Sequence, residues 1–258
     1  MTDKVLIESL HDNQIVRITL NAPKANVLDS EMMGGLQETL EGLRAKTSLK
    51  LIQFTGAGEH FCFGASVSEH TKEKAPQMLK QFHGLFYTLA DLAIPTAAMV
   101  SGQCLGGGLE LALMCNFIFV DKTAKLGQPE INLGVFAPPA SIILPMKVGQ
   151  AGADELLLTG KIISADQAVA MGLAMQLYDD QEAMKSGVDE WAEKAILTKS
   201  AASLRCAVQA ARLQFNETLR TQLAKIERFY HEELMATHDA NEGIQSFLER
   251  RKPKWEDR

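Results

Sequence analysis

The chain begins with two short stretches in which apolar and polar positions alternate with a period of two. Residues 4–10 and 15–20 carry this alternation, and Asp12 and Asn13, which favour tight turns, lie between them. The pattern predicts a β-hairpin whose second strand ends at residues 21–23.

The next stretch changes from a period of two to helical spacing. Asp29 or Ser30 is a suitable N-cap, and residues 51–55 form a short apolar run that stops at Gly56. A strand, helix and strand in this order predict a right-handed parallel crossover. The apolar positions that define the predicted helix are Met33, Leu36, Leu40 and Leu43.

Strands and helices continue to alternate as far as about residue 135. The spacing of apolar residues predicts a helix over 76–92, a strand over 95–100, a helix over 109–115 and a strand over 117–120. This alternation favours an α/β core with mostly parallel strands.

Beyond residue 136 the pattern is mainly helical. A capping box begins at Ser164, because Gln167 follows three residues later. We therefore predict a core over residues 1–195 and a helical region over 196–258. The helices expected in this half of the chain are 138–146, 154–158, 164–172, 183–197, 201–215, 218–236 and 240–250.

Composition narrows the possible functions. The chain is 46% hydrophobic and 22% charged, and its net charge of −6 disfavours nucleic-acid binding, although a phosphorylated cofactor remains possible. It holds no apolar tract of roughly 18 residues that could span a bilayer. Residues 1–10 lack a basic start followed by an apolar segment, which favours a cytoplasmic location.

Cysteine and histidine residues do not form a recognisable metal motif. The four cysteines lack a CxxC pair and have no histidine at zinc-ligand spacing, so we interpret them as reduced, small apolar residues. His60, His70 and His83 are likewise interpreted as structural or exposed, and no metal site is expected.

Two glutamates occupy unusual positions. Glu110 lies in the first turn of a predicted apolar helix after three glycines, and Glu130 follows Pro129 just beyond a predicted strand. If Glu110 is buried, loss of hydration raises its pKa and lets it carry a proton near neutral pH. The simpler alternatives are that Glu110 caps its own helix and that Glu130 is a solvated turn residue.

Three motifs then resemble the crotonase (enoyl-CoA hydratase/isomerase) superfamily. They are residues 103–112 (QCLGGGLELA), 127–131 (GQPEI) and 159–165 (TGKIISA), which occur in the family's order. The resemblance implies an α/β fold, a spiral of ββα repeats with a helical C-terminal trimerisation region. It also implies a homotrimer or homohexamer that binds an acyl-CoA thioester, in which coenzyme A is part of the substrate and no separate cofactor is needed.

The resemblance also implies a set of catalytic groups. The backbone N–H groups of Ala65 and Gly107 would form an oxyanion hole for the thioester carbonyl, and Glu110 and Glu130 would hold a water and act as acid and base. Which glutamate plays which part is left open. Lys24 and Ala25 match the region of the family that contacts the adenine and pantetheine of coenzyme A.

Within the superfamily, the chain most resembles cyclohexa-1,5-diene-1-carbonyl-CoA hydratases of anaerobic benzoyl-CoA breakdown. Residues 60–70 (HFCFGASVSEH), 134–141 (GVFAPPAS) and 232–240 (EELMATHDA) carry this likeness. Ser66 replaces an Asp common in ordinary hydratases, and Ser68 replaces a lysine that in some of them meets coenzyme A. The residues expected to contact the acyl group are Phe63, Ser66, Val67, Phe136 and Pro138.

The sequence thus predicts a hydratase that adds water to a cyclic dienoyl-CoA. Phe136 and the following prolines are expected to make a stiff apolar wall suited to a ring. The alternatives are a straight-chain 2-enoyl-CoA hydratase or an enoyl-CoA isomerase and, least favoured, a non-catalytic RNA-binding homologue.

Overall fold

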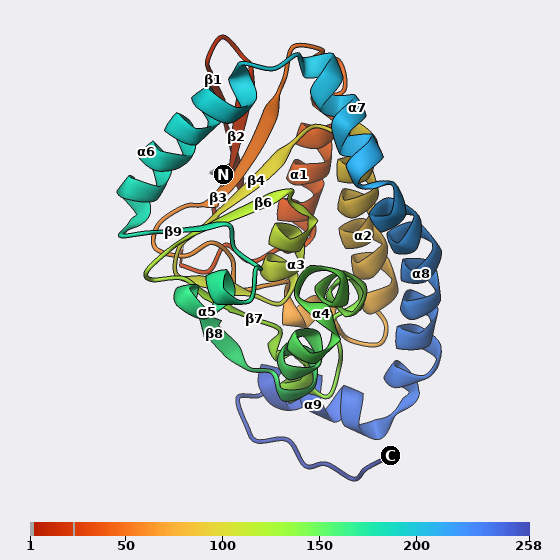
Figure 1. The fold of residues 1–258 in the computed structure, drawn as a ribbon. Helices are drawn as coiled ribbons and strands as arrows, with labels where there is room; N and C mark the ends of the chain where they lie inside the picture. Colours follow the sequence, from red (N-terminus) through yellow and green to blue (C-terminus); the bar gives the residue numbers. More distant parts are fainter. Residues whose placement is uncertain (1–2, 23) are drawn as a thin grey trace.

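The structure, a computed structural model, describes residues 3–22 and 24–258 and contains two sheets (Figure 1). Pro23, where the hairpin was expected to end, lies outside the described residues. The six-stranded sheet has the order β1-β2-β3-β4-β6-β9 and the three-stranded sheet the order β5-β7-β8. The strands are β1 (Val5–Leu10), β2 (Ile15–Leu20), β3 (Leu51–Gly56), β4 (Thr96–Val100), β5 (Gln103–Leu105), β6 (Phe117–Asp121), β7 (Lys125–Gly127), β8 (Ile162–Ser164) and β9 (Gln176–Tyr178).

The predicted hairpin and the predicted parallel core are both confirmed. β1 pairs with β2 in antiparallel register, whereas β2, β3, β4, β6 and β9 are parallel along the large sheet. His11, Asp12 and Asn13 have positive φ angles of 50°, 53° and 64°, so the predicted turn reverses the chain through left-handed backbone.

Nine α-helices are present in the described part of the chain (Figure 1). The expected N-caps at Asp29 and Ser164 are confirmed, since each side chain accepts a hydrogen bond from the first turn of its helix. The helices are α1 (Ser30–Gly42), α2 (Ala75–Leu92), α3 (Gly107–Met114), α4 (Pro138–Thr159, bent at Gly149), α5 (Ala165–Ala170), α6 (Gln181–Ala192), α7 (Ala201–Ala211), α8 (Leu213–Glu232) and α9 (His238–Leu248).

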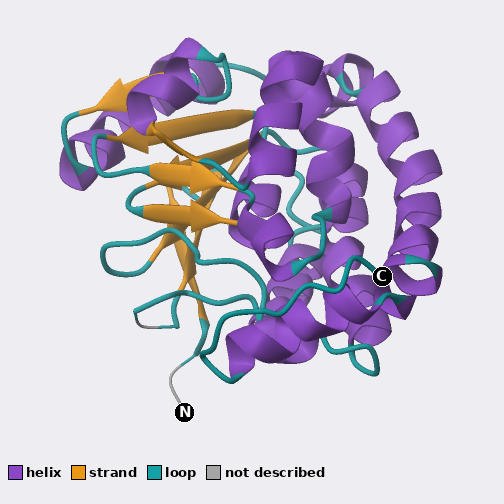
Figure 2. Cartoon of the chain, turned by 90° about the horizontal axis from the view of Figure 1, so that it is seen from below, coloured by secondary structure: helices purple, strands orange, loops and turns teal. Residues whose placement is uncertain are grey.

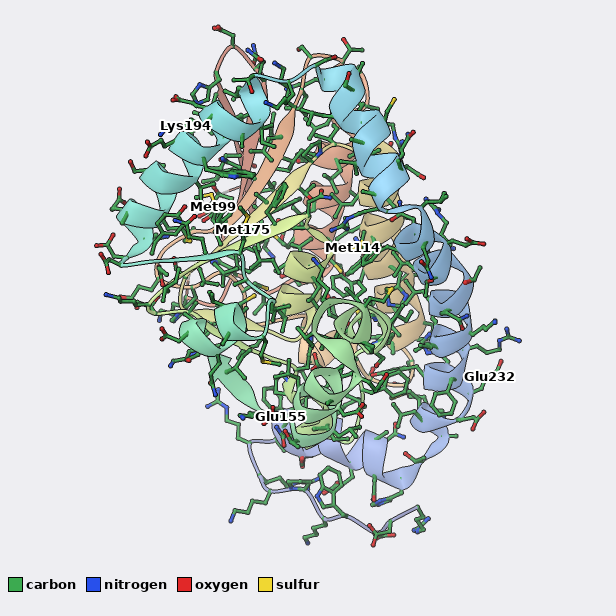
Figure 3. The ribbon with its side chains drawn as sticks, in the orientation of Figure 1. Met99, Met114, Glu155, Met175, Lys194 and Glu232 are labelled. Carbon is green, nitrogen blue, oxygen red and sulfur yellow. The ribbon has the colours of Figure 1, made fainter. Side chains whose placement is uncertain are left out.

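The large sheet carries helices on both faces, because successive residues of its inner strands point to opposite faces and nearly all of them are buried. Ile15 of β2 packs with Met99 of β4 and with residues of α6, whereas Val16 packs into the larger core that contains α1, α2 and α3. Figures 1 and 2 show helices on both sides of the sheet. Met99 and Met114 lie in the interior, whereas Lys194 lies at the periphery, as Figure 3 shows.

Both ends of α3 are fixed by contacts with distant segments. At its start, a Cβ on Gly108 would lie 2.7 Å from the carbonyl oxygen of Cys62, so only glycine permits this approach. At its end, Arg212 donates to the carbonyl oxygens of Met114 and Cys115, and Lys147 donates to that of Cys115. These cations stabilise the negative end of the helix dipole and hold the C-terminal end of α3 in place.

Several features differ from the sequence prediction. The helices predicted over 138–146 and 154–158 form one bent helix, α4, and strand β9 was not predicted. The small sheet was not predicted, because its strands are three residues long and show no detectable period. The break between α7 and α8 falls at Arg212, whose backbone is not helical (φ −106°, ψ 12°), rather than after residue 215. The stretch over residues 193–197 is a turn of π-helix. Cys206 is exposed, in contrast to the buried Cys62, Cys104 and Cys115.

The two C-terminal helices fold back over the core. α8 runs beside α2 and α4, and α9 packs against the 3-10 helix Pro129–Leu133 that follows β7 (Figure 1). Within residues 3–22 and 24–258, no helix is sufficiently long and apolar to cross a bilayer. The placement of α8 and α9 brings residues from the end of the chain to the site described next.

Candidate active site

A cavity of about 570 Å³ lies where the loop after β3, the start of α3 and the C-terminal helices meet. Most of the side chains around it are apolar, and Glu110 and Glu130 are its only carboxylates among the described residues. A large apolar cavity with a few convergent polar groups is the usual form of a small-molecule site.

Glu110 is buried, with 4% of its surface exposed, and its partner is the start of another helix. Its Oε1 accepts a hydrogen bond of 2.9 Å from the backbone N–H of Ala140. Pro138 and Pro139, the first two residues of α4, have no N–H, so Ala140 provides the first free donor of that helix. Glu110 therefore does not cap its own helix, which was the simpler alternative.

Burial raises the pKa of Glu110 well above its usual range, and the charge of Glu130 raises it further. The hydrogen bond from Ala140 acts in the opposite direction, because it stabilises the ionised form. Glu110 is thus a carboxyl group that holds a proton far more readily than a solvated glutamate. This matches the prediction made for a buried acid at this position.

Glu130 faces the same cavity from the 3-10 helix Pro129–Leu133. Gly106, with a φ of +50°, leaves room for it, since a Cβ there would overlap Glu130 Oε1. The buried Gln128 amide nitrogen, in the orientation that satisfies both groups, lies 2.9 Å from Oε2 and 3.2 Å from Oε1. Glu130 is therefore a positioned group rather than a freely solvated turn residue.

Burial raises the pKa of Glu130 to about 7, compared with 4.5 for an ordinary glutamate. The pair therefore exchanges protons near neutral pH. Two carboxyl groups in a shared apolar environment resist simultaneous ionisation, so one protonated and one ionised group is the favoured state. Such a pair can remove a proton from one atom and deliver a proton to another.

The raised pKa of Glu130 also predicts a change in stability with pH. The Glu130→Gln variant should unfold at a higher temperature than the wild type at pH 8 and at nearly the same temperature at pH 4. Between pH 4.5 and 7 the unfolded chain releases this proton while the folded chain retains it, so wild-type stability falls as pH rises. At pH values above 7, the free energy of unfolding of Glu130→Gln should exceed that of the wild type by about 3 kcal/mol.

Thermal unfolding at pH 4, 6 and 8 would measure this gap, and Glu217→Gln, an exposed glutamate on α8, is the matched control. The control should shift the unfolding temperature little at any pH. A Glu130→Gln variant that is less stable than the wild type at pH 8 would contradict the destabilising charge inferred here.

The backbone N–H groups of Ala65 and Gly107 belong to two segments that lie close together at the cavity wall. A Cβ built on Gly107 would lie 3.0 Å from the nitrogen of Ala65, which shows how closely the two segments approach. Within the described ranges, neither N–H donates a hydrogen bond to the protein, and Gly107 is the first residue of α3. Two free amides at a helix N-terminus are suited to bind an oxygen that acquires negative charge.

The other residues predicted from the sequence are brought together with one exception. Phe63 is 42% exposed, which places it near the mouth of the cavity, whereas Phe136 is partly buried. Lys24 is exposed and does not line the cavity, so its expected contact with coenzyme A stays a prediction. The predicted residues that do line the cavity are Ala25, Phe63, Ala65, Ser66, Val67, Gly107, Glu110, Glu130, Phe136 and Pro138.

The C-terminal helices contribute residues that sequence reasoning missed. Tyr230 of α8 lines the cavity, and it lies on the buried stripe of that helix with Leu219 and Leu223. This helical spacing was the available signal, but it does not indicate which part of the core the stripe covers. The other lining residues missed near the C-terminus are Ile244, Phe247 and Leu248.

Of the histidines interpreted from the sequence as structural or exposed, His83 is buried away from the cavity, whereas His70 lines it. His83 is buried and its Nδ1 lies 2.8 Å from Glu227 Oε2, whereas His70 Nδ1 lies 2.8 Å from the carbonyl oxygen of Ser66. Burial lowers the pKa of His70. In the described part of the chain, no group of three or more His, Cys, Asp or Glu residues is arranged to hold a metal ion.

Comparison with known proteins gives consistent matches over the whole chain. Residues 11–258 match the family model described as enoyl-CoA hydratase/isomerase. A Thauera aromatica protein named cyclohexa-1,5-dienecarbonyl-CoA hydratase is 43% identical over 255 residues, which are 99% of this chain and 97% of that protein. A Rhizobium meliloti protein named probable enoyl-CoA hydratase is 33% identical over 259 residues, 99% of each chain.

A solved structure gives the same result for the fold. The crystal structure of an enoyl-CoA hydratase from Mycobacterium avium subsp. paratuberculosis superposes with a TM-score of 0.85, covering 98% of this chain and 99% of that one. The two sequences are only 21% identical, so this match concerns the fold alone. The predicted α/β fold of the superfamily is confirmed.

Proposed function

We propose, from the premise that this chain belongs to the enoyl-CoA hydratase/isomerase family, that it adds water to a cyclic dienoyl-CoA. The substrate that we propose is cyclohexa-1,5-diene-1-carbonyl-CoA, and the product is a hydroxycyclohexene-carbonyl-CoA. The observation that carries this proposal is the convergence of the buried Glu110, the partly buried Glu130 and two free backbone amides on one apolar cavity.

The amides of Ala65 and Gly107 would bind the thioester oxygen. Polarisation of this carbonyl draws electron density from the conjugated double bonds and makes a ring carbon electrophilic. The negative charge that develops on the oxygen lies at the N-terminus of α3, where the helix dipole stabilises it. In this way the two amides lower the barrier to formation of the enolate.

The two glutamates would transfer the protons during the addition of water. One carboxylate takes a proton from the water as the water oxygen bonds to the ring, and the other carboxyl group donates a proton to carbon as the enolate collapses. The sum of these steps is the addition of one water molecule, with each carboxyl group returned to its starting state by proton exchange. A pKa of about 7 for Glu130 suits such exchange near neutral pH.

The wall of the acyl site supports a ring rather than a flexible chain. Phe136 stacks on Phe229, with ring centroids 5.7 Å apart, and Pro138 and Pro139 stiffen the segment that follows. Flat rigid walls favour a planar ligand because little side-chain freedom is lost on binding. The 43% identity to the Thauera aromatica protein supports the same substrate.

The proposal is tested by mixing the wild-type protein separately with cyclohexa-1,5-diene-1-carbonyl-CoA and with crotonyl-CoA. Loss of conjugated absorbance and the mass of the product measure hydration. We expect the mass of the cyclic substrate to rise by one water, with kcat/KM at least about tenfold above that for crotonyl-CoA. Faster hydration of crotonyl-CoA would overturn the choice of a ring substrate.

A straight-chain 2-enoyl-CoA hydratase is the second candidate, and the Rhizobium meliloti protein named probable enoyl-CoA hydratase, 33% identical, supports enoyl-CoA hydration in general. The same assay distinguishes it, since it would hydrate crotonyl-CoA. An isomerase would change the position of the double bond without adding mass. We further propose that the reaction needs no cofactor beyond the coenzyme A of the substrate, and that the chain forms a homotrimer or homohexamer.

A further inference from the structure

Tyr230 has a buried hydroxyl group with no hydrogen-bond partner in the described chain. Its side chain is 1% exposed and lines the cavity that contains Glu110 and Glu130. Buried polar groups are nearly always hydrogen-bonded, because an unsatisfied hydroxyl loses its hydration without compensation. The hydroxyl therefore points to a ligand in the cavity rather than to a role in holding the fold.

Packing fixes the direction of the Tyr230 ring. Phe136 meets it edge to face, with ring centroids 5.3 Å apart and an interplanar angle of 76°. Phe136 is in turn stacked on Phe229 at an angle of 24°. Since the ring is fixed by these neighbours, the hydroxyl cannot turn away to find a partner elsewhere.

The nearby glutamates determine whether the Tyr230 hydroxyl acts as a hydrogen-bond donor. Burial raises the pKa of Tyr230, and the negative charges of Glu130 and Glu110 raise it further. The phenol is therefore a neutral donor near the two glutamates. The amides proposed to bind the thioester oxygen approach each other at Gly107, in the first turn of the helix that carries Glu110.

We propose that the Tyr230 hydroxyl donates a hydrogen bond to the water that Glu110 and Glu130 hold for addition, and afterwards to the hydroxyl group of the product. This inference rests on the proposed hydration reaction. A buried water needs two to four polar partners, and the two glutamates supply two of them. The hydrogen bond from Tyr230 is the third contact, and it fixes the direction from which the water oxygen approaches the substrate.

The test is the Tyr230→Phe variant, compared with Tyr87→Phe as the control. Tyr87 lies on α2, is partly buried with Arg220 over its ring, and does not line the cavity. Tyr230→Phe should lower kcat about 10- to 100-fold while KM changes less than about threefold. Tyr87→Phe should leave both values unchanged.

Two further readouts separate this role from a structural one. Without the hydroxyl, the water beside the ionised glutamate loses a donor and the carboxylate is less stabilised, so the acidic limb of the kcat/KM profile should move to higher pH. The unfolding temperature of Tyr230→Phe should equal or exceed that of the wild type, because the variant removes an unsatisfied buried group and keeps the ring. If Tyr230 were only structural, Tyr230→Phe would be less stable than the wild type and the acidic limb of its kcat/KM profile would not move.

The outcomes distinguish this inference from the proposed function. If the wild type hydrates an enoyl-CoA and Tyr230→Phe matches it in kcat and pH profile, the inference is wrong and the proposed function stands. If the wild type hydrates neither thioester, the proposed function fails and the inference fails with it. A lower unfolding temperature with an unchanged pH profile would also overturn the inference, since it identifies a packing role.

Discussion

Replacing Glu130 with glutamine is expected to lower kcat for hydration by about 10²- to 10⁴-fold, which is the usual contribution of a positioned acid or base. Glutamine keeps the shape of the side chain but can neither accept a proton from water nor deliver one to carbon. The same loss is expected for Glu110→Gln, because addition of water requires both a proton acceptor and a proton donor. Steady-state hydration of the cyclic dienoyl-CoA measures both variants.

The double variant Glu110→Gln/Glu130→Gln tests whether the two glutamates act together. If the two glutamates act on one water, removal of both should cost little more than removal of one, since groups that act as a unit are not additive. Glu217→Gln on the exposed face of α8 should retain wild-type kcat. Hydration that survives either single substitution at the wild-type rate would exclude the two-acid mechanism.

Adding a methyl group at Gly107 is expected to lower kcat by about 10²- to 10³-fold, the usual effect of losing one donor of an oxyanion hole. In Gly107→Ala the new Cβ would lie 3.0 Å from the Ala65 nitrogen and 3.3 Å from Phe82 Cζ. It would push the two amides apart and occupy part of the space needed by the thioester oxygen. Hydration kinetics give the rate, and the carbonyl ¹³C shift of a bound saturated acyl-CoA reports its polarisation.

Gly84→Ala is the matched control for this substitution. Gly84 also lies in a helix, α2, and its nearest neighbour to a new Cβ is Gln37 Oε1 at 3.9 Å. The control should keep full activity and stability. Wild-type kcat and an unchanged ¹³C shift in a folded Gly107→Ala protein would contradict the assignment of these amides as the oxyanion hole.

Local sequence patterns predicted most of the large elements because those elements depend on near neighbours. The alternation in β2, the N-cap of α1 at Asp29 and the capping box at Ser164 each involve residues within a few positions of one another. The three-residue strands of the small sheet are too short to show a period. Hydrogen bonds to distant partners form them, so they were missed.

In the site, too, residues within short motifs were predicted, whereas residues brought in from distant segments were missed. Gly107 and Glu110 lie in one motif, and Glu130 follows soon after in the second, so both glutamates and this amide could be predicted. Ala140 and Tyr230 were missed, although Ala140 donates to Glu110 and Tyr230 lines the same cavity as both glutamates. Their importance arises from the folding of α4 and α8 against the core, which no local spacing reveals.

The printed sequence alone specified an α/β core, its resemblance to the enoyl-CoA hydratase/isomerase family and the two glutamates, because periodicity and contiguous motifs encode these features. The tertiary structure decided the properties of the site. Burial raises the pKa of Glu110 and that of Glu130, the N-terminus of α4 binds Glu110, and α8 brings the Tyr230 hydroxyl to the cavity. Desolvation and charge proximity depend on distances in space, and only the folded chain sets those distances.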